Sequence, residues 1–359
     1  MRINDFTPPL PTAVDFNATA DAPLPPEMPP EVHAAFSLTQ LLDRSMKAFN
    51  RNLENMLKVQ PNAQKMAEVL LAGGTAELVI AEFMEQVHAK RIRSQMFTQQ
   101  LQQCGAVMTH CMAAMPGEQQ QQLVGELQRI WSDLLSRPLP DEIAEELDPG
   151  VKSSNDFFDK LLELIDLIKN GYLAGYEHIL KAYSAFFSDF NAEITAVMKD
   201  WIIAIDEGKY IAVSTGPFRA ALEKLIQKYT LPNPAAVLFP KPGQGGASKE
   251  EAEKWLKALG LPESCLVKNP DGSYCVVIDT GPLRLMKDGL PAQDFVHWDP
   301  SRFQSWQTGF NAQEERMKNL LQSLTQKYSN ANAYHDNFNK VLSSHLNQFA
   351  DMLKAMLNF

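Results

Sequence analysis

The stretch of residues 301–357 constrains the fold more than any other part of the chain. It contains no proline, and its only glycine is Gly309. Apolar residues fill ten of twelve positions at alternating three- and four-residue spacing, the pattern of a helix that supercoils against a partner. The twelve positions are Phe303, Trp306, Phe310, Gln313, Met317, Leu320, Leu324, Lys327, Ala331, Tyr334, Phe338 and Val341. Such a helix would be roughly 80 Å long, so the sequence predicts a coiled coil with a partner in the same chain.

The partner is predicted in residues 151–205, where Ser153 or Asn155 can cap a second long helix. Its apolar positions follow one another ten times over 36 residues, at the helical period of 3.6, from Ile165 to Trp201. Both helices are rich in aromatic residues, and each large side chain that is fully buried stabilises the fold by about 1.5–3 kcal/mol. The residues expected in the shared core are Tyr172, Tyr176, Phe186, Phe190, Trp306, Phe310, Leu324 and Phe338.

Residues 206–299 have a different pattern and predict a small mixed α/β domain inserted between the two helices. Strand-like runs at 210–213 and 275–278 each lead into Thr-Gly-Pro-x-Arg, in which x is apolar. This repeat predicts a capping threonine hydroxyl, a proline in the first turn and a helix. A short strand at 237–239, a capping box that begins at Ser248 and a hairpin that turns at residues 269–272 complete the domain.

The N-terminal part of the chain predicts a leader and a helical module. Residues 1–36 hold eight prolines and few large apolar groups, which is typical of disorder. Residues 37–136 predict a separate helical hairpin or bundle, with breaks at Pro61, at Gly73-Gly74 and at Pro116-Gly117, and an acidic linker follows to residue 150. The fold class is therefore mainly α: an antiparallel intramolecular coiled coil of residues 151–205 and 300–359, with the inserted domain and the N-terminal module.

Composition excludes several function classes. The net charge is −10 and no strongly basic block occurs, which argues against nucleic acid as a partner. No apolar run approaches the eighteen or so residues that cross a bilayer, so no direct membrane span is expected. The first residues lack the apolar core of a classical secretory signal peptide. On these observations alone the protein would be placed in the cytosol.

No motif points to catalysis, to a cofactor or to a metal. Gly243–Lys249 matches neither common phosphate-binding pattern, and the sequence has no Cys-x-x-Cys and no His-Glu-x-x-His. His335 and His345 fall within the long last helix and are expected to be packed or solvated. The cysteines are expected to be free thiols, although Cys265 and Cys275 flank the hairpin and could approach each other. The sequence therefore predicts a protein that is not an enzyme.

A polar stripe opposite the apolar positions of the last helix is the most informative surface. It consists of Ser329, Asn332, Asp336, Lys340, Ser343, Asn347, Asp351 and Lys354, at three- and four-residue spacing. Spacing alone favours an ordinary solvated face. However, amides and short polar groups are mediocre helix formers, and residues 326–332 are rich in them, which suits a surface that contacts another helix.

This C-terminal region resembles the needle-tip proteins of type III secretion systems, the IpaD/SipD/BipD group. The resemblance rests on Thr-Gln-Lys-Tyr-Ser-Asn-Ala-Asn at 325–332, continued at 336–337 and 340–344. Three further segments support it, at 306–315, 237–240 and 261–266. The similarity extends in collinear order over about residues 155–359 and is strongest to the SipD-type branch. Residues 37–136 carry no motif of the family.

The resemblance implies a fold and a function. Family members have the coiled coil with an inserted α/β domain, and an N-terminal helical hairpin that acts as an intramolecular chaperone. They pass from the cytoplasm through the secretion apparatus by means of an unstructured N-terminal segment, and then assemble at the needle tip on the bacterial surface. Their partners are the needle filament protein, the hydrophobic translocator proteins and further copies in a pentamer, and enteric members bind bile salts.

For this chain the resemblance changes two expectations. It favours a secreted protein over a cytosolic one, and it favours the docking interpretation of the polar stripe. The residues expected to contact the needle or a neighbouring protomer are Ser329, Asn332, Asp336, Asn337, Lys340, Ser343 and Asn347. The alternatives are a secreted effector, a pore-forming translocator, for which no apolar helix is found, and an intracellular coiled-coil scaffold without enzymatic activity.

Overall fold

The structure is a computed structural model that describes residues 36–73, 76–143 and 147–358. The predicted disordered leader lies outside the described residues, apart from Phe36. Leu38–Phe359 form one compact unit. Its helices are α1 (Leu38–Leu57), α2 (Ala63–Leu71), α3 (Ala76–Ala113), α4 (Gly117–Leu135), α5 (Ser154–Asp166), α6 (Ala174–Phe190), α7 (Met198–Trp201), α8 (Thr215–Lys228), α9 (Lys249–Leu259), α10 (Gly281–Asp288) and α11 (Pro300–Leu357).

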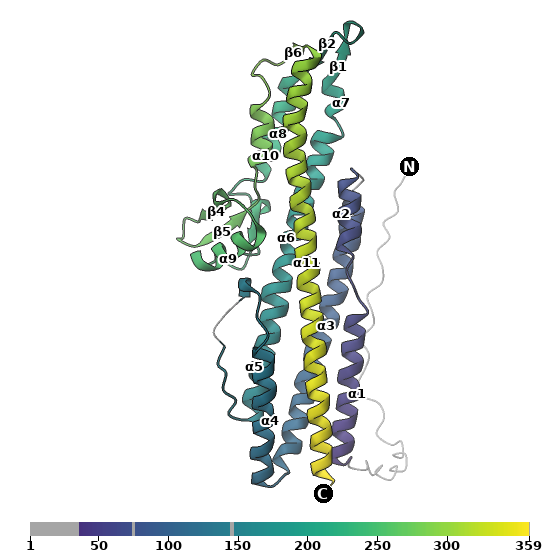
Figure 1. The fold of residues 1–359 in the computed structure, drawn as a ribbon, viewed down its shortest axis with the longest axis vertical. Helices are drawn as coiled ribbons and strands as arrows, with labels where there is room; N and C mark the ends of the chain where they lie inside the picture. The colour runs from purple at the N-terminus through teal and green to yellow at the C-terminus, as the bar shows by residue number, and fades with distance from the viewer. Residues whose placement is uncertain (1–35, 74–75, 144–146, 359) are drawn as a thin grey trace, which may run out of the picture. The chain divides into compact units, whose positions relative to one another are not determined.

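The predicted last helix is confirmed as α11, which runs beside the other long helices (Figure 1). Asp299 caps it: one carboxylate oxygen of Asp299 accepts a hydrogen bond of 3.0 Å from the backbone N–H of Arg302. Proline in the first turn suits this position because its missing N–H would have no partner inside the helix. With 58 residues and a rise of 1.5 Å per residue, α11 is about 87 Å long.

The partner helix exists, but it is not one regular helix to residue 205 as predicted. Ser153 caps α5, and π-helical turns at Leu167–Leu173 and Asn191–Thr195 separate α5, α6 and α7. A π turn adds one residue to a helical turn, and an average period of 3.6 over the whole segment does not reveal such a local insertion. The helix ends at Trp201, and the next four residues form a strand.

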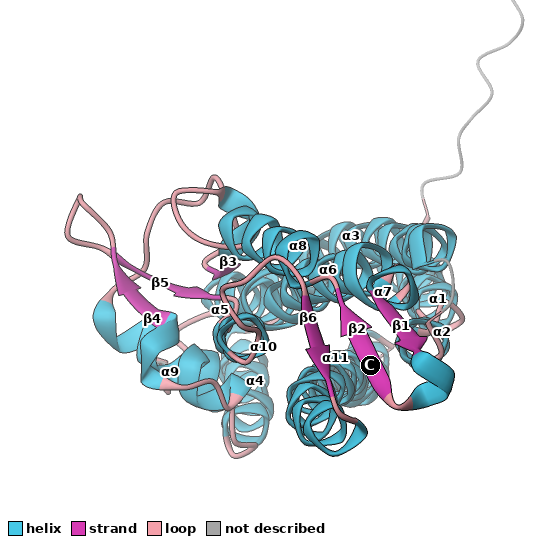
Figure 2. Cartoon of the chain, turned by 90° about the horizontal axis from the view of Figure 1, so that it is seen from above, coloured by secondary structure: helices cyan, strands magenta, loops and turns pink. Residues whose placement is uncertain are grey.

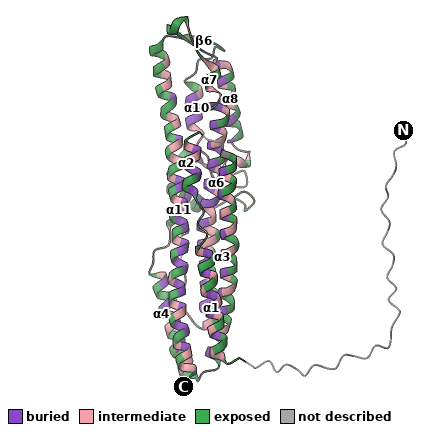
Figure 3. Cartoon of the chain, turned by 90° about the vertical axis from the view of Figure 1, so that its right-hand side faces the viewer, coloured by how far each residue is buried: buried purple, intermediate pink, exposed green. Residues whose placement is uncertain are grey.

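Aromatic side chains hold α6 against the N-terminal half of α11. The rings of Phe190 and Phe310 stack with their centroids 6.4 Å apart, and the hydroxyl of Tyr183 donates a hydrogen bond of 3.1 Å to the carbonyl oxygen of Met317. Of the eight predicted core residues, all are buried except Trp306, which is partly buried and packs against Trp298. On α11 the buried residues recur from Phe310 to Leu353, and the first turns of the helix are exposed or partly buried (Figure 3).

The C-terminal half of α11 has different neighbours from those predicted. It contacts α1, where Asn50 bonds Ser343 and Asn347, and α3, where Lys90 bonds Asp336, whereas α5 packs on α3 and α4. Gly105 allows the close approach of α3 and α5, because a Cβ atom there would lie 2.8 Å from the ring of Phe158. The described N-terminal helices begin and end near the predicted breaks. They share one continuous core with the coil and do not pack as a separate bundle.

The inserted region contains two three-stranded antiparallel sheets. Their strands, shown from the end of the helices in Figure 2, have the orders β1-β2-β6 and β3-β5-β4. The strands are β1 (Ile202–Ile205), β2 (Tyr210–Val213), β3 (Val237–Phe239), β4 (Leu266–Lys268), β5 (Tyr274–Val277) and β6 (Val296–Trp298). The hairpin turns as predicted, with the Gly272 N–H donating to the carbonyl oxygen of Asn269 at 3.0 Å.

Local capping was predicted correctly at one of three helices in this region. At α9, Ser248 and Glu251 form both hydrogen bonds of a capping box. At α8 and α10 the threonine hydroxyls do not cap: the Thr215 hydroxyl donates to the carbonyl oxygen of Gln293, and the carboxylate of Asp279 accepts from Gly281 N–H at 2.8 Å. The Thr215 hydroxyl is therefore used in a contact with a distant segment, and Asp279 takes the capping role that was predicted for Thr280. The four cysteines are buried free thiols.

The aromatic contact between α6 and α11 makes a direct prediction about stability. Phe190→Ala removes a fully buried ring and should lower the free energy of unfolding by about 3–5 kcal/mol, because it leaves a cavity among rigid neighbours. Urea denaturation would measure the loss. Leu285→Ala is the matched control, since that side chain is 54% exposed, and its effect should stay within about 0.5 kcal/mol. Equal losses in the two variants would contradict this account of the core.

Candidate functional site

The predicted docking stripe on α11 is not a solvated outer face. Asn332, Asp336 and Ser343 are buried and Ser329 and Asn347 are half-buried, while Asn337 and Lys340 are exposed. The covering segments are α1, the connection to α2, and α3, which lie beside α11 (Figure 1). The structure thus brings the stripe together with a second partner from the same chain. Whether these residues also contact a needle or another protomer stays a prediction.

Asp336 is the centre of the upper part of this contact. Its Oδ2 atom accepts hydrogen bonds from the Lys90 ammonium at 2.7 Å and from the Gln60 side-chain amide at 2.8 Å. Its Oδ1 atom lies 3.3 Å from Nδ1 of His335. Lys90 comes from α3 and Gln60 from the α1–α2 connection, so one carboxylate ties two N-terminal segments to α11.

Burial sets the charges in this cluster. Burial lowers the pKa of Lys90, although the ion pair with Asp336 opposes the shift. Burial alone would raise the pKa of Asp336, but hydrogen bonds from His335, Gln60 and Lys90 together hold it below its ordinary value. Asp336 is therefore ionised and paired with Lys90. When one partner of such a buried pair is removed, the other charge is left without compensation, at a cost of about 3–5 kcal/mol.

His335 lies in the same cluster and is 1% exposed. Its Nε2 atom is 3.3 Å from the Ser94 hydroxyl and 3.2 Å from the side-chain nitrogen of Asn339. Burial lowers the pKa of His335. The ring is therefore neutral, and it is packed as the sequence suggests. His345, by contrast, lies near the surface, 2.9 Å from a carboxylate oxygen of Asp133.

The lower part of the contact is a row of amides. The Asn50 and Asn347 side chains exchange hydrogen bonds of 2.9 and 3.1 Å, and the Ser343 hydroxyl donates to Asn50 at 3.0 Å. Further along, Lys354 and Asp43 form an ion pair of 2.7 Å between partly exposed groups. Asp43 pairs with Lys354, and the later residue Asn50 pairs with the earlier residues Ser343 and Asn347. The two helices are therefore antiparallel, and these polar groups fix their register.

Sequence reasoning missed the N-terminal partners of the stripe. One signal was present: Lys90 and Ser94 interrupt the apolar spacing of Phe83, Val87, Phe97 and Leu101 on α3. A lysine in such a position must find a buried acidic partner, because an unpaired buried charge is very costly. The acidic partner lies 246 residues away, and its identity could not be read from the sequence.

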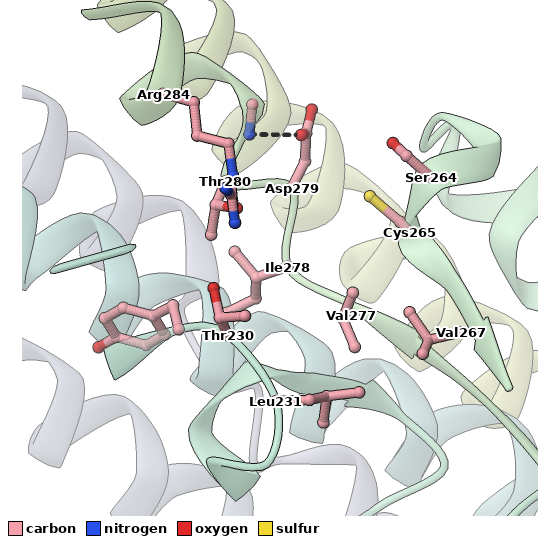
Figure 4. A pocket seen from close by; sticks show the side chains of 12 residues that line it. Thr230, Leu231, Ser264, Cys265, Val267, Val277, Ile278, Asp279, Thr280 and Arg284 are labelled. Carbon is pink, nitrogen blue, oxygen red and sulfur yellow. Dashed lines mark hydrogen bonds between the residues drawn. The ribbon is translucent and has the colours of Figure 1, made fainter. Parts of the chain in front are cut away.

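The structure has a cavity beside these elements and another in the inserted region. One of about 350 Å³ lies between the α1–α2 connection and α11, lined by Gln60, Pro61 and the stripe residues around Asn332. The other, of about 430 Å³, lies between the hairpin and the start of α10 (Figure 4). Its walls are largely apolar, with Leu231, Val277 and Ile278, and Arg284 lies at its edge.

The described residues show neither a metal site nor a membrane span. Nowhere in the described ranges do three histidine, cysteine or acidic residues gather closely enough to hold a metal ion. Similarly, no helix within these ranges is long and apolar enough to cross a bilayer.

The buried histidine makes stability depend on pH. The folded protein keeps His335 neutral, while the unfolded chain binds a proton below pH 6.5, so stability is lost as the pH falls from about 6.5. Between pH 7.5 and 5.5 the wild type should lose about 1 kcal/mol more than His335→Gln in urea denaturation. The exposed control, His88→Gln, should keep the wild-type dependence. Identical pH dependence in wild type and His335→Gln would contradict the assignment.

Comparison with known proteins identifies the family. Cell invasion protein SipD of Salmonella typhi is 38% identical over 211 residues, a match that covers 57% of this chain and 62% of that protein. Invasin IpaD of Shigella flexneri is 35% identical over 211 residues, with 58% and 61% covered, and translocator protein BipD of Burkholderia thailandensis is 30% identical over 199 residues, with 55% and 58% covered. The chain thus matches less than two thirds of the length of these relatives.

A solved structure agrees over a larger part of the chain. The pathogenicity island 1 effector protein from Chromobacterium violaceum superposes with a TM-score of 0.67 at 28% identity, and the match covers 87% of this chain and 99% of that one. This confirms the coiled coil with its inserted domain. The model of type III secretion systems tip complex components matches residues 31–357. The chain belongs to the family of type III secretion tip complex components.

Proposed function

We propose that this chain caps the needle of a type III secretion system, restrains secretion, and serves as a platform for hydrophobic translocator proteins during invasion of a host cell. Family membership supports this role, and related proteins are named for cell invasion and translocation. In this proposal the protein is made in the cytoplasm, is secreted, and assembles as a pentamer on the needle at the bacterial surface. It acts as a structural and regulatory protein and not as an enzyme.

The observation that carries the mechanism is the polar contact between α1 and α11. Toward α3, α1 presents apolar groups: the rings of Phe49 and Phe97 are 5.0 Å apart, and Met46 contacts Cys104. Toward α11 it presents Asp43 and Asn50. Water can replace such polar contacts at little net cost, because each hydrogen bond contributes only about 0.5–1.5 kcal/mol net. In this proposal α1 leaves α11 while its contact with α3 is kept, and the incoming partner covers the apolar residues of α11 that lie between the polar ones, such as Leu346.

In this proposal the N-terminal helices act as an intramolecular chaperone. They cover Asn332, Asp336, Ser343 and Asn347 before assembly and expose them when the needle or a neighbouring protomer takes their place. Because Asp336 is buried, a charge reversal at this residue does not test docking alone. Reversal of its charge would disrupt the buried pair with Lys90 and destabilise the fold. A covalent lock between α1 and α11 tests the mechanism without touching that pair.

A disulfide can supply this lock. Asn50→Cys/Ser343→Cys places two thiols at facing positions of α1 and α11, where the Ser343 hydroxyl donates to the Asn50 oxygen at 3.0 Å, and the loss of two free thiols on oxidation shows that the disulfide has formed. The oxidised protein should no longer cap isolated needles, as measured by antibody labelling, and reduction should restore capping. Asn50→Cys alone is the control for the substitution itself. If the oxidised, cross-linked protein caps needles as well as the reduced one, α1 does not need to leave α11.

The cavity beside α10 supports a second proposal, that this protein binds bile salts. A bile salt is a rigid steroid with hydroxyl groups on one face and one anionic group, and it suits a largely apolar cavity of about 430 Å³ with a guanidinium at its edge (Figure 4). The Asp279 carboxylate also lines this cavity, but its charge is compensated by the ion pair of 2.7 Å with Arg316. Arg284 is partly held by the Thr280 hydroxyl, 3.3 Å from its Nε atom, and its terminal nitrogens can turn to a carboxylate.

Equilibrium titration with deoxycholate tests this proposal. Binding should be saturable, and Arg284→Ala should weaken it by roughly five- to tenfold, since the ion pair would be partly exposed to solvent. Lys257→Ala, on α9 and outside the cavity lining, should bind as the wild type does. Titration without saturation would end the bile-salt proposal and leave the needle-tip role untouched.

A further inference from the structure

In one buried side-chain amide on the covered face of α11, the nitrogen has a hydrogen-bond partner and the oxygen has none. Asn332 is 8% exposed, and its Nδ2 atom donates a hydrogen bond of 2.9 Å to Oε1 of Gln60. No donor in the described part of the chain reaches its Oδ1 atom, although that atom is buried. A buried acceptor without a partner costs about 1–3 kcal/mol, so the internal cover leaves an unfavourable group at this point.

Gln60 cannot satisfy this oxygen. Its Nε2 atom already donates to the carbonyl oxygen of Leu57 at 2.9 Å and to Oδ2 of Asp336 at 2.8 Å. A primary amide carries only two N–H donors, so none remains for Asn332. Reversing the Asn332 amide would place its oxygen against the oxygen of Gln60. The connection between α1 and α2 is therefore a poorer partner for Asn332 than an amide with free donors would be.

The α1–α2 connection also leaves room on this part of α11. The cavity of about 350 Å³ lies between Pro61 and α11, and Ser329, Asn337 and Lys340 line it together with Asn332. Lys340 is exposed and forms no ion pair with the described residues. A side chain that enters here meets an unfilled space lined by Asn332, whose unsatisfied Oδ1 atom is itself covered by its neighbours.

We propose that the helix which replaces the α1–α2 connection on α11 presents a primary amide to Asn332, and that Gln60 is the internal competitor which it displaces. Two amides face to face form two hydrogen bonds, so this partner satisfies both Nδ2 and Oδ1 of Asn332, whereas Gln60 satisfies one. Asn332 thereby determines which helix binds. The inference rests on the proposed docking of this face at the needle, and it names the side chain that the partner supplies.

A double-variant experiment separates the internal contact from the external one. The probe is isolated needles, and the measured quantity is the affinity of the purified full chain for them. Gln60→Ala removes the competitor from an exposed position and should raise the affinity about threefold or more. Asn332→Ala in that background should then lower it about tenfold, because two hydrogen bonds to the partner are lost. Circular dichroism and thermal melting check that each variant stays folded.

Each outcome has a distinct meaning. Asn330→Ala in the Gln60→Ala background is the matched control, since Asn330 is exposed on the same helix, and it should leave the affinity unchanged. If Asn332→Ala has no effect once Gln60 is absent, Asn332 serves only the internal contact and the inference is overturned, while the needle role stands. If folded wild type and folded Gln60→Ala both fail to bind needles, the proposed docking itself is wrong.

Discussion

The ion pair between Lys90 and Asp336 is the contact on which the arrangement of the N-terminal helices depends. It joins α3 to α11 at a distance of 2.7 Å, with both side chains almost fully buried. An apolar pair of the same volume could stabilise these helices equally well or better. What the ion pair adds is position: Asp336 can be satisfied only where Lys90, Gln60 and His335 all reach it. The register of α1, α2 and α3 on α11 follows from this requirement.

Much of the fold could be predicted from local sequence patterns. The limits of α11, the capping box at Ser248 and the turn at residues 269–272 are fixed by residues close together in the chain, so their sequence is enough. The π-helical turns were missed because an added residue disappears in an averaged period. The threonine caps failed because Thr215 instead bonds Gln293, which is 78 residues away.

In the candidate site, too, local features could be predicted from the sequence and long-range contacts could not. The spacing of the polar stripe was found correctly, because it belongs to one helix. Its environment was not, because Asn50, Gln60 and Lys90 lie more than 240 residues from their partners on α11. Polar residues at regular spacing predict a face, but a solvated face and a face buried against other polar groups have the same pattern. Only the interrupted apolar spacing around Lys90 on α3 distinguishes them.

The two halves of α11 differ in how readily their contacts can be exchanged. Near Phe310 the helix is held by stacked aromatic rings, whose burial is lost entirely if the contact opens. Near Ser343 amides and hydroxyls lie beside the buried Leu342 and Leu346, and these polar groups can exchange one hydrogen-bond partner for another at little net cost. In the proposed mechanism, the aromatic end of α11 keeps its contacts and the end near Ser343 changes its neighbour. The orphaned oxygen of Asn332 lies in the exchangeable half, where a better partner gains the most.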